Sequence, residues 1–250
     1  MTTLRGKTAL VIGGSSGVGE ATARMLLSEG VRVTAVARGA ERLQLLEAEL
    51  GDGFGAIVGD ASDPAFAAQV LGEILPDLLI ISAGVPAQTG VFDAFDWDSF
   101  SAAWNSDLKI SFHFMKQAFA LPLRPGSTIV MVSSGASING SPLSGGYAGA
   151  KRMQWLLAGY AQKQSDERQL GLRTIAVLPT QLIEGSVIAA GASKAYGAMA
   201  GITAEEFMNR IPFPLTNEKV ATAIVGALRG ELPLGTTAIG VSGNSIDPLK

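Results

Sequence analysis

The chain has 250 residues, of which 47% are apolar and 16% charged, so a disordered protein is excluded and one large core is expected. Its formal net charge of −3 provides no basic field, which excludes nucleic acid and anionic lipid as expected partners. Cysteine is absent and His113 is the only histidine, which excludes disulfides, thiolate chemistry and a zinc site of His and Cys; no metal is expected.

Short β-branched runs alternate with longer amphipathic segments along the whole chain, without a repeat or a linker. Most of these runs are apolar throughout, which is typical of strands covered on both faces. The alternation predicts a single α/β domain, Rossmann-like, with a doubly wound parallel sheet of about seven strands and helices on both faces. The expected strands are Thr8–Ile12, Arg32–Ala37, Phe54–Val58, Leu78–Ser82, Ser127–Ser133, Leu172–Leu178 and Thr237–Val241.

The first run, Thr8 to Ile12, is too short for a signal-peptide core or a membrane span, and no later run approaches a spanning length. We therefore expect a cytoplasmic protein that does not enter the membrane. The first helix is expected to start near Gly17 and to stop at Gly30, a natural C-terminal glycine. Another is expected after a cap at Thr216.

A glycine-rich loop, Gly13-Gly14-Ser15-Ser16-Gly17-Val18-Gly19, follows the first strand directly and precedes a helical pattern. Glycines let a backbone approach a pyrophosphate closely, and the free N–H groups at the helix start hold its charge. The spacing Gly-x-x-x-Gly-x-Gly also suits a mere tight turn, and only its position between strand and helix favours the dinucleotide interpretation.

The same loop contains Gly13-x-Ser15-x-Gly17, the pattern of a serine hydrolase elbow. That chemistry needs a histidine base, and only His113 is available, inside the apolar helical run Ile110–Phe119. We interpret His113 as an ordinary helix residue, so the hydrolase hypothesis comes last.

The second strand ends on Ala37 and Arg38, where dinucleotide sites specific for NAD carry an acidic residue. A guanidinium at this turn suits a 2′-phosphate, so NADP(H) is favoured over NAD(H), with Arg42 as a possible helper. The alternative for Arg38 is a solvated loop cation.

Ser134 follows the fifth strand, and thirteen positions later the chain reads Tyr147-Ala148-Gly149-Ala150-Lys151. On a helix, this offset puts the phenol of Tyr147 and the ammonium of Lys151 on one face. A nearby ammonium favours a phenolate, and Ser134 could hydrogen-bond a substrate oxygen. The spacing alone also fits a surface pair, and the combination with the glycine loop makes the catalytic interpretation more specific.

With these motifs the sequence resembles the classical short-chain dehydrogenase/reductase (SDR) family over nearly its whole length. Further matches are Asp60-Ala61 after the third strand, Ser82-Ala83-Gly84 after the fourth and Pro179 after the sixth. The resemblance implies that Tyr147 is the general acid/base of hydride transfer between NADP(H) and a small carbonyl or alcohol. It implies that Lys151 holds the ribose hydroxyls and that Ser134 orients the substrate carbonyl. The expected cofactor contacts are Gly13, Ser15, Ser16, Gly17, Val18, Gly19, Arg38, Asp60, Ala61, Ala83, Gly84, Tyr147, Lys151, Pro179 and Leu182.

Some positions depart from the family pattern: Ile12, Thr180 and Glu184 replace its usual residues. The family's catalytic asparagine, thought to act largely through its carbonyl in a water relay, corresponds to Asp107, and a shift of two residues would choose Asn105 instead. These departures motivate a second hypothesis, a dinucleotide-binding sensor whose catalysis has lapsed. An epimerase or dehydratase with bound NAD is a third, but such relatives usually have a longer substrate domain.

The segment from Leu182 to about Thr203 is rich in Gly and Ala and is expected to be a mobile substrate loop. The expected pocket walls are Pro86, Ile138, Leu143, Leu182, Tyr196 and Met199, which favours an uncharged substrate. Asp93, Asp96 and Asp98 could bind a cation, but helix capping is preferred. Surplus apolar residues on the helices near Trp104–Phe119 and Met153–Tyr160, and the family resemblance, predict a homodimer or homotetramer.

Overall fold

The computed structural model describes residues 2–121 and 123–249. Within these residues, one sheet of eight strands runs in the order β3-β2-β1-β4-β5-β6-β7-β8, parallel except for the antiparallel pair β7–β8. The strands are β1 (Thr8–Ile12), β2 (Arg32–Ala37), β3 (Phe54–Val58), β4 (Leu78–Ile81), β5 (Thr128–Val132), β6 (Arg173–Pro179), β7 (Ala238–Val241) and β8 (Ile246–Pro248). The predicted α/β class and parallel sheet are confirmed, and only β8 was not expected.

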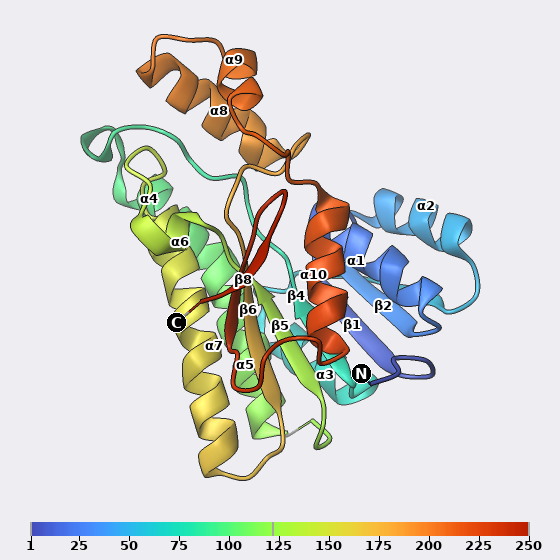
Figure 1. Ribbon diagram of the computed structural model, residues 1–250. Helices are drawn as coiled ribbons and strands as arrows, with labels where there is room; N and C mark the ends of the chain where they lie inside the picture. The colour runs from blue at the N-terminus through green and yellow to red at the C-terminus, as the bar shows by residue number, and fades with distance from the viewer. Residues whose placement is uncertain (1, 122, 250) are drawn as a thin grey trace.

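Helices cover both faces of the sheet (Figure 1). On one face lie α1 (Gly17–Ser28), α2 (Ala40–Leu50) and α10 (Asn217–Leu228), and on the other lie α3 (Pro64–Ile74), α5 (Lys109–Ala120) and α7 (Tyr147–Glu167). Shorter helical pieces complete the chain: η1 (Phe92–Ala94), α4 (Trp97–Ala103), the π-helical turn η2 (Trp104–Leu108), α6 (Ala136–Asn139), α8 (Val187–Met199) and α9 (Ala204–Asn209).

Two hydrophobic cores, one on each face, explain why most of the strands are apolar along nearly their whole length. In β1, Ala9 and Val11 pack into the core beneath α1 and α10, whereas Leu10 and Ile12 pack into the core beneath α3, α5 and α7. Successive strand residues point to opposite faces, so a strand covered twice needs apolar side chains throughout.

The predicted helix ends agree with the structure. α1 ends at Ser28, and Gly30 has a φ of +77°, a left-handed conformation that glycine adopts without strain. The hydroxyl of Thr216 caps α10 by accepting a hydrogen bond from the Lys219 amide. None of the helices in the described part of the chain is both long and apolar enough to cross a membrane.

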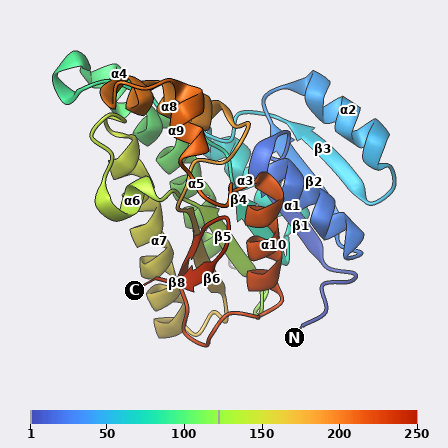
Figure 2. The same cartoon turned by 45° about the horizontal axis from the view of Figure 1, so that its top comes forward.

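The Leu182–Thr203 segment is mainly helical, which corrects its description as a loop. α8 occupies most of it, with the hydroxyl of Ser186 capping its first turn, and α9 follows directly. Figure 2 shows α8 and α9 at the same end of the molecule as α4, beyond the sheet. They border the end of the sheet where the ligand of a doubly wound fold binds.

Candidate active site

A cavity of about 780 Å³ lies at the carboxyl ends of the parallel strands. Segments that follow β1 to β6 line it, together with the start of α8. This is the edge of the sheet where the chain passes from β3 across to β4, the switch point at which open α/β sheets bind ligands. The predicted site residues that line it are Gly13, Ser15, Ser16, Gly17, Val18, Arg38, Asp60, Ala61, Ala83, Gly84, Asp107, Ser134, Tyr147, Lys151, Pro179 and Leu182.

The glycine loop brings bare backbone to one wall of this cavity. Gly13 has a φ of +84°, and a Cβ there would lie 2.6 Å from the Cα of Ala83. Gly19 does not line the cavity, so its expected contact with the cofactor stays a prediction. A Cβ at Gly19 would lie 2.1 Å from the Gly13 carbonyl oxygen, so this glycine lets α1 pack against the loop.

Glycine-rich backbone, followed by the first turn of a helix, is a fitting cradle for a phosphate group. The first amides of α1 have no partner within the helix, and its positive dipole end faces the cavity where Gly17 and Val18 line it. The loop therefore suits the pyrophosphate of a dinucleotide.

At the end of β2, Arg38 lines the cavity, whereas Arg42 does not. The Arg42 guanidinium forms an ion pair with Glu20 at 2.7 Å and donates to the Ser15 carbonyl at 3.3 Å. Arg42 therefore braces the glycine loop from outside. Asp60, after β3, accepts hydrogen bonds from the amide and the hydroxyl of Ser62, which lower the pKa of its carboxyl.

Tyr147 opens α7, and Lys151 follows one turn later on the same face, as the spacing predicts. Their exposed fractions are 7% and 5%, and the Lys151 Nζ lies 5.5 Å from the centre of the Tyr147 ring. The hydroxyl of Ser133 donates to the Lys151 carbonyl at 2.7 Å and ties α7 to the end of β5. The Ser134 Oγ accepts a hydrogen bond from the Ala136 amide at 3.2 Å. The three predicted residues thus line one cavity.

Asp107 forms a buried ion pair with Lys151. Its Oδ2 lies 2.9 Å from the Lys151 Nζ, and its Oδ1 accepts from the Val85 amide at 2.9 Å. Burial lowers the pKa of Lys151, but the charges of Asp107 and Tyr147 and the close contact of the ammonium with the Asp107 carboxylate outweigh it, so the net direction is upward. Asn105 also lines the cavity, yet its amide donates to the Ser101 hydroxyl at 3.0 Å. Asp107, not Asn105, is thus the residue that contacts Lys151.

Sequence reasoning missed the residues behind Asp107. Gln154 is fully buried in α7, and its Nε2 donates to the Asp107 carbonyl at 3.0 Å and to the Ser111 hydroxyl at 2.7 Å. The Ser111 hydroxyl in turn donates to the same carbonyl at 2.9 Å. The sequence offered one signal for Gln154: it lies three residues after Lys151, so the two side chains fall on the same face of the helix.

Other predicted features fall outside the cavity. Of the six expected pocket walls, Pro86 and Leu182 line it, whereas Ile138, Leu143, Tyr196 and Met199 do not. His113 does not line it either, so Ser15 has no histidine base there and the hydrolase hypothesis is wrong.

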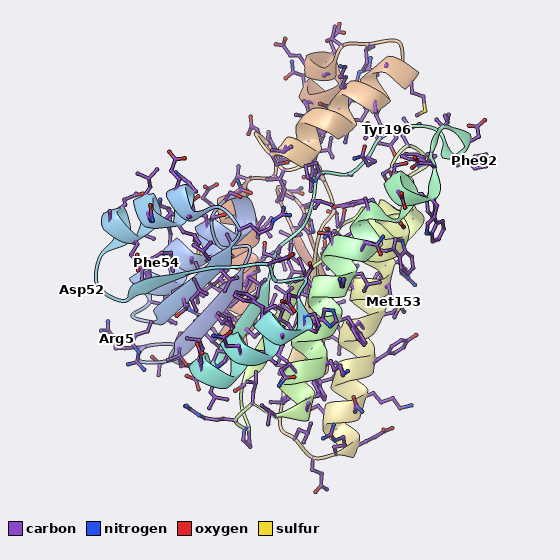
Figure 3. The ribbon with its side chains drawn as sticks, turned by 180° about the vertical axis from the view of Figure 1, so that it is seen from behind. Arg5, Asp52, Phe54, Phe92, Met153 and Tyr196 are labelled. Carbon is purple, nitrogen blue, oxygen red and sulfur yellow. The ribbon has the colours of Figure 1, made fainter. Side chains whose placement is uncertain are left out.

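Two of the remaining groups have structural explanations. The carboxylate of Asp96 caps α4 through the Ser99 amide at 2.8 Å, as preferred over a cation site. Tyr196, on α8, hydrogen-bonds the hydroxyl of Ser141 and stacks on Phe207 of α9, with ring centres 6.0 Å apart. Figure 3 shows Tyr196 on the side of α8 nearest the loop that carries Phe92.

Known proteins resemble this chain in sequence and in fold. The sequence profile described as short chain dehydrogenase matches residues 7–183. A short chain dehydrogenase/reductase of Macrophomina phaseolina is 31% identical over 151 residues, which cover 56% of this chain and 86% of that protein. A 2-dehydro-3-deoxy-L-rhamnonate dehydrogenase (NAD(+)) of a Sphingomonas species is 30% identical over 154 residues, 58% of this chain and 61% of that enzyme.

The likeness in fold extends further along the chain than the likeness in sequence. The crystal structure of 3-ketoacyl-(acyl-carrier-protein) reductase from Brucella melitensis, complexed with NADH, superposes with a TM-score of 0.80 at 19% identity. The superposition covers 96% of this chain and 98% of the Brucella protein. At this identity the likeness concerns the fold.

Proposed function

Because this chain belongs to the short chain dehydrogenase family, we propose that it is an oxidoreductase that transfers a hydride between NADP(H) and a carbonyl or alcohol. One observation carries the proposal. Tyr147 and Lys151 lie buried one helical turn apart and line the cavity beside the glycine loop. A poised proton donor next to a dinucleotide cradle is the arrangement that carbonyl reduction needs.

The residues of the cavity fit a nicotinamide dinucleotide, which supplies or accepts the hydride when bound. The glycine loop from Gly13 to Val18 would hold the pyrophosphate, and Asp60 and Ala61 would border the adenine. Lys151 would hold the ribose hydroxyls, while Ala83, Gly84, Pro179 and Leu182 would enclose the nicotinamide end.

Three side chains would act on the substrate and its proton. Tyr147 would donate a proton to the carbonyl oxygen, or take it from the alcohol in the reverse direction. The Lys151 ammonium would stabilise the phenolate that remains after donation. Ser134 would hydrogen-bond the substrate oxygen while negative charge develops on it.

The preference for NADP(H) rests on the end of β2. Ala37 and Arg38 line the cavity there, with no carboxylate to bind a ribose 2′-hydroxyl. A guanidinium can bind a 2′-phosphate bidentately, and Arg38 is exposed enough to move toward one. The related Sphingomonas enzyme bears NAD(+) in its name, so the NADP(H) preference is argued from Arg38 of this chain and not from that relative.

The substrate is proposed to be an uncharged ketone, aldehyde or alcohol. Pro86, Val187 and Ile188 are apolar residues that line the same cavity as Tyr147. The charge of Lys151 is balanced by Asp107, which leaves the catalytic end without net charge to attract an anion.

Turnover of a carbonyl panel tests the proposal, with NADPH and NADH followed by their nicotinamide absorbance. Tyr147→Phe is expected to lower kcat by about 10²–10⁴-fold with little change in NADPH affinity, because it removes only the acid/base hydroxyl. Tyr160→Phe is the matched control, since Tyr160 lies on the same helix but is 58% exposed. NADPH binding without turnover of any carbonyl by the unaltered protein would instead favour the lapsed sensor.

A homodimer or homotetramer in the cytoplasm is the proposed assembly and location. Phe112 on α5 and Tyr160 on α7 are half exposed, and Met153 lies on the outer side of α7 (Figure 3). Sedimentation analysis checks the assembly: a monomer at all concentrations would contradict it.

A further inference from the structure

The buried group least explained by the proposed chemistry is Gln154. Its side chain is fully buried, and within the described residues its Oε1 accepts no hydrogen bond. A buried polar side chain of this kind is normally held by hydrogen bonds, so its place behind Asp107 calls for an explanation. Its amide nitrogen, by contrast, makes two hydrogen bonds, both to the residues that hold Asp107.

Two side chains donate to the Asp107 carbonyl. A carbonyl oxygen has two lone pairs, and here Gln154 and Ser111 both donate to it. The turn that carries it is π-helical, a rare geometry with i→i+5 backbone hydrogen bonds that occurs mostly as single turns inside α-helices. The two side chains therefore fix the position of η2 relative to α7.

The position of η2 sets the orientation of the Asp107 carboxylate. One oxygen accepts from the Val85 amide, and the other lies against Lys151 and so close to Gly84 that a Cβ there would approach it to 2.6 Å. The carboxylate is fully buried, so little water is near to screen its charge. Lys151 has three N–H donors, so a contact with Asp107 leaves others for a ligand in the cavity.

We propose that Gln154 is a positioning residue, which holds the Asp107 carboxylate as a fixed counter-charge so that Lys151 remains an ammonium. The inference rests on the proposed function, because it takes Lys151 as the group that binds the cofactor ribose. Gln154 and Ser111 do not line the cavity and act through Asp107.

The consequence is a dependence of cofactor binding on pH. The charged or titratable groups that act on Lys151 are Asp107, from η2, and Tyr147, from its own helix; the β4 turn at Gly84 and Val85 and the β5 end at Ser133 are uncharged. Burial alone lowers the pKa of Lys151, and Asp107 opposes it. Without the Asp107 carboxylate, the pKa of Lys151 is lower. As the pH rises, Lys151 then loses its proton earlier, and the loss of NADPH affinity begins at a lower pH than in the unaltered protein.

Asp107→Asn tests this by equilibrium binding of NADPH across pH. The alkaline limit, which is the pH above which NADPH affinity falls, is expected to move down by about one pH unit or more. The kcat for carbonyl reduction is expected to follow the same shift. An equal loss of affinity at every pH would overturn the counter-charge, because a purely structural defect has no reason to titrate.

Gln154→Met tests the positioning role without a buried unpaired charge, since it keeps shape and removes the donor. The alkaline limit of NADPH affinity is expected to move down by a few tenths of a pH unit. The kcat is expected to fall about 3–10-fold, with KM nearly unchanged. Ser111→Ala, which removes the other donor, is expected to shift the limit in the same direction by less. In the Asp107→Asn background, Gln154→Met is expected to add no further shift.

Gln162→Met is the matched control, because Gln162 lies on the same helix and also hydrogen-bonds through its amide, to Asp166 and Leu172. It is expected to leave the pH limit of NADPH affinity unchanged. A Gln154→Met profile that matches that of Gln162→Met would overturn the proposal. Binding is measured without turnover, so this result is separate from the Tyr147→Phe result on which the proposed function depends.

Discussion

The glycine loop and the α8–α9 segment face the same cavity but are built in opposite ways. An added Cβ at Gly13 or Gly19 would collide with backbone, whereas one at Gly191 in α8 would meet nothing within 4 Å. The loop lies between strand and helix, while α8 is tied to the body at its far end by the Tyr196–Ser141 hydrogen bond. A rigid cradle suits a ligand part that never varies, and a separate cover formed by α8 and α9 suits a ligand that must enter and leave.

The sharpest way to break this comparison is Gly19→Ala. A methyl group 2.1 Å from the Gly13 carbonyl oxygen forces α1 away from the loop. We expect a loss of about 1–3 kcal/mol in the free energy of unfolding, the usual effect of overpacking. NADPH affinity should fall more than about 100-fold, since the loop amides lose their alignment. Denaturant unfolding and NADPH titration measure both effects; a variant with wild-type affinity would show that the loop is not rigid.

Arg38→Ala tests whether the cradle also selects the cofactor. We expect NADPH affinity to fall about 10–100-fold, the value of a charge-assisted bidentate contact, with less than a twofold change for NADH. Arg42→Ala should have a smaller effect, because Arg42 is already paired with Glu20. Competition binding of the two cofactors gives the ratio. Equal weakening of both would contradict the assignment of Arg38 to a 2′-phosphate.

Local sequence patterns predicted the strands and the glycine loop well, but predicted α8 and α9 poorly. The seven predicted strands start and end within one residue of expectation, because most of them are apolar runs between turn residues. The segment of α8 reads Val-Ile-Ala-Ala-Gly-Ala-Ser-Lys-Ala-Tyr-Gly-Ala-Met, in which small residues hide the helical period. β8 is three exposed residues that end on a proline, and its pairing with β7 depends on tertiary structure.

Within the site, residues on one element were predictable and contacts between elements were not. Tyr147 and Lys151 share a helix, so their spacing fixes their relative placement. The contact of Gln154 with Asp107 depends on how α7 crosses η2, which no periodicity encodes. The same holds for the choice between Asp107 and Asn105, which a shift of the π-helical turn decides.

Tyr196→Phe tests how firmly α8 and α9, the cover, are attached to the rest of the protein. The change removes the hydrogen bond to Ser141 and keeps the stacking on Phe207. We expect KM for the carbonyl to rise about 3–10-fold, as for the loss of one hydrogen bond, while NADPH affinity changes less than twofold. Ser141→Ala should give the same rise, and the double variant should add nothing. A change in NADPH affinity larger than that in KM would mean that the cover also holds the cofactor.

Gly191→Ala has the smallest expected effect and separates the two regions most directly. Gly191 lies inside α8 with open space around it, so alanine should stabilise the helix by about 0.5–1 kcal/mol by restricting the unfolded chain. If α8 opens independently of the sheet, this gain appears as slower amide exchange in α8 and not in the denaturant midpoint of the whole protein. If the global free energy of unfolding rises by the full amount instead, α8 unfolds together with the core. The cover would then be as firmly bound to the sheet as the glycine loop is.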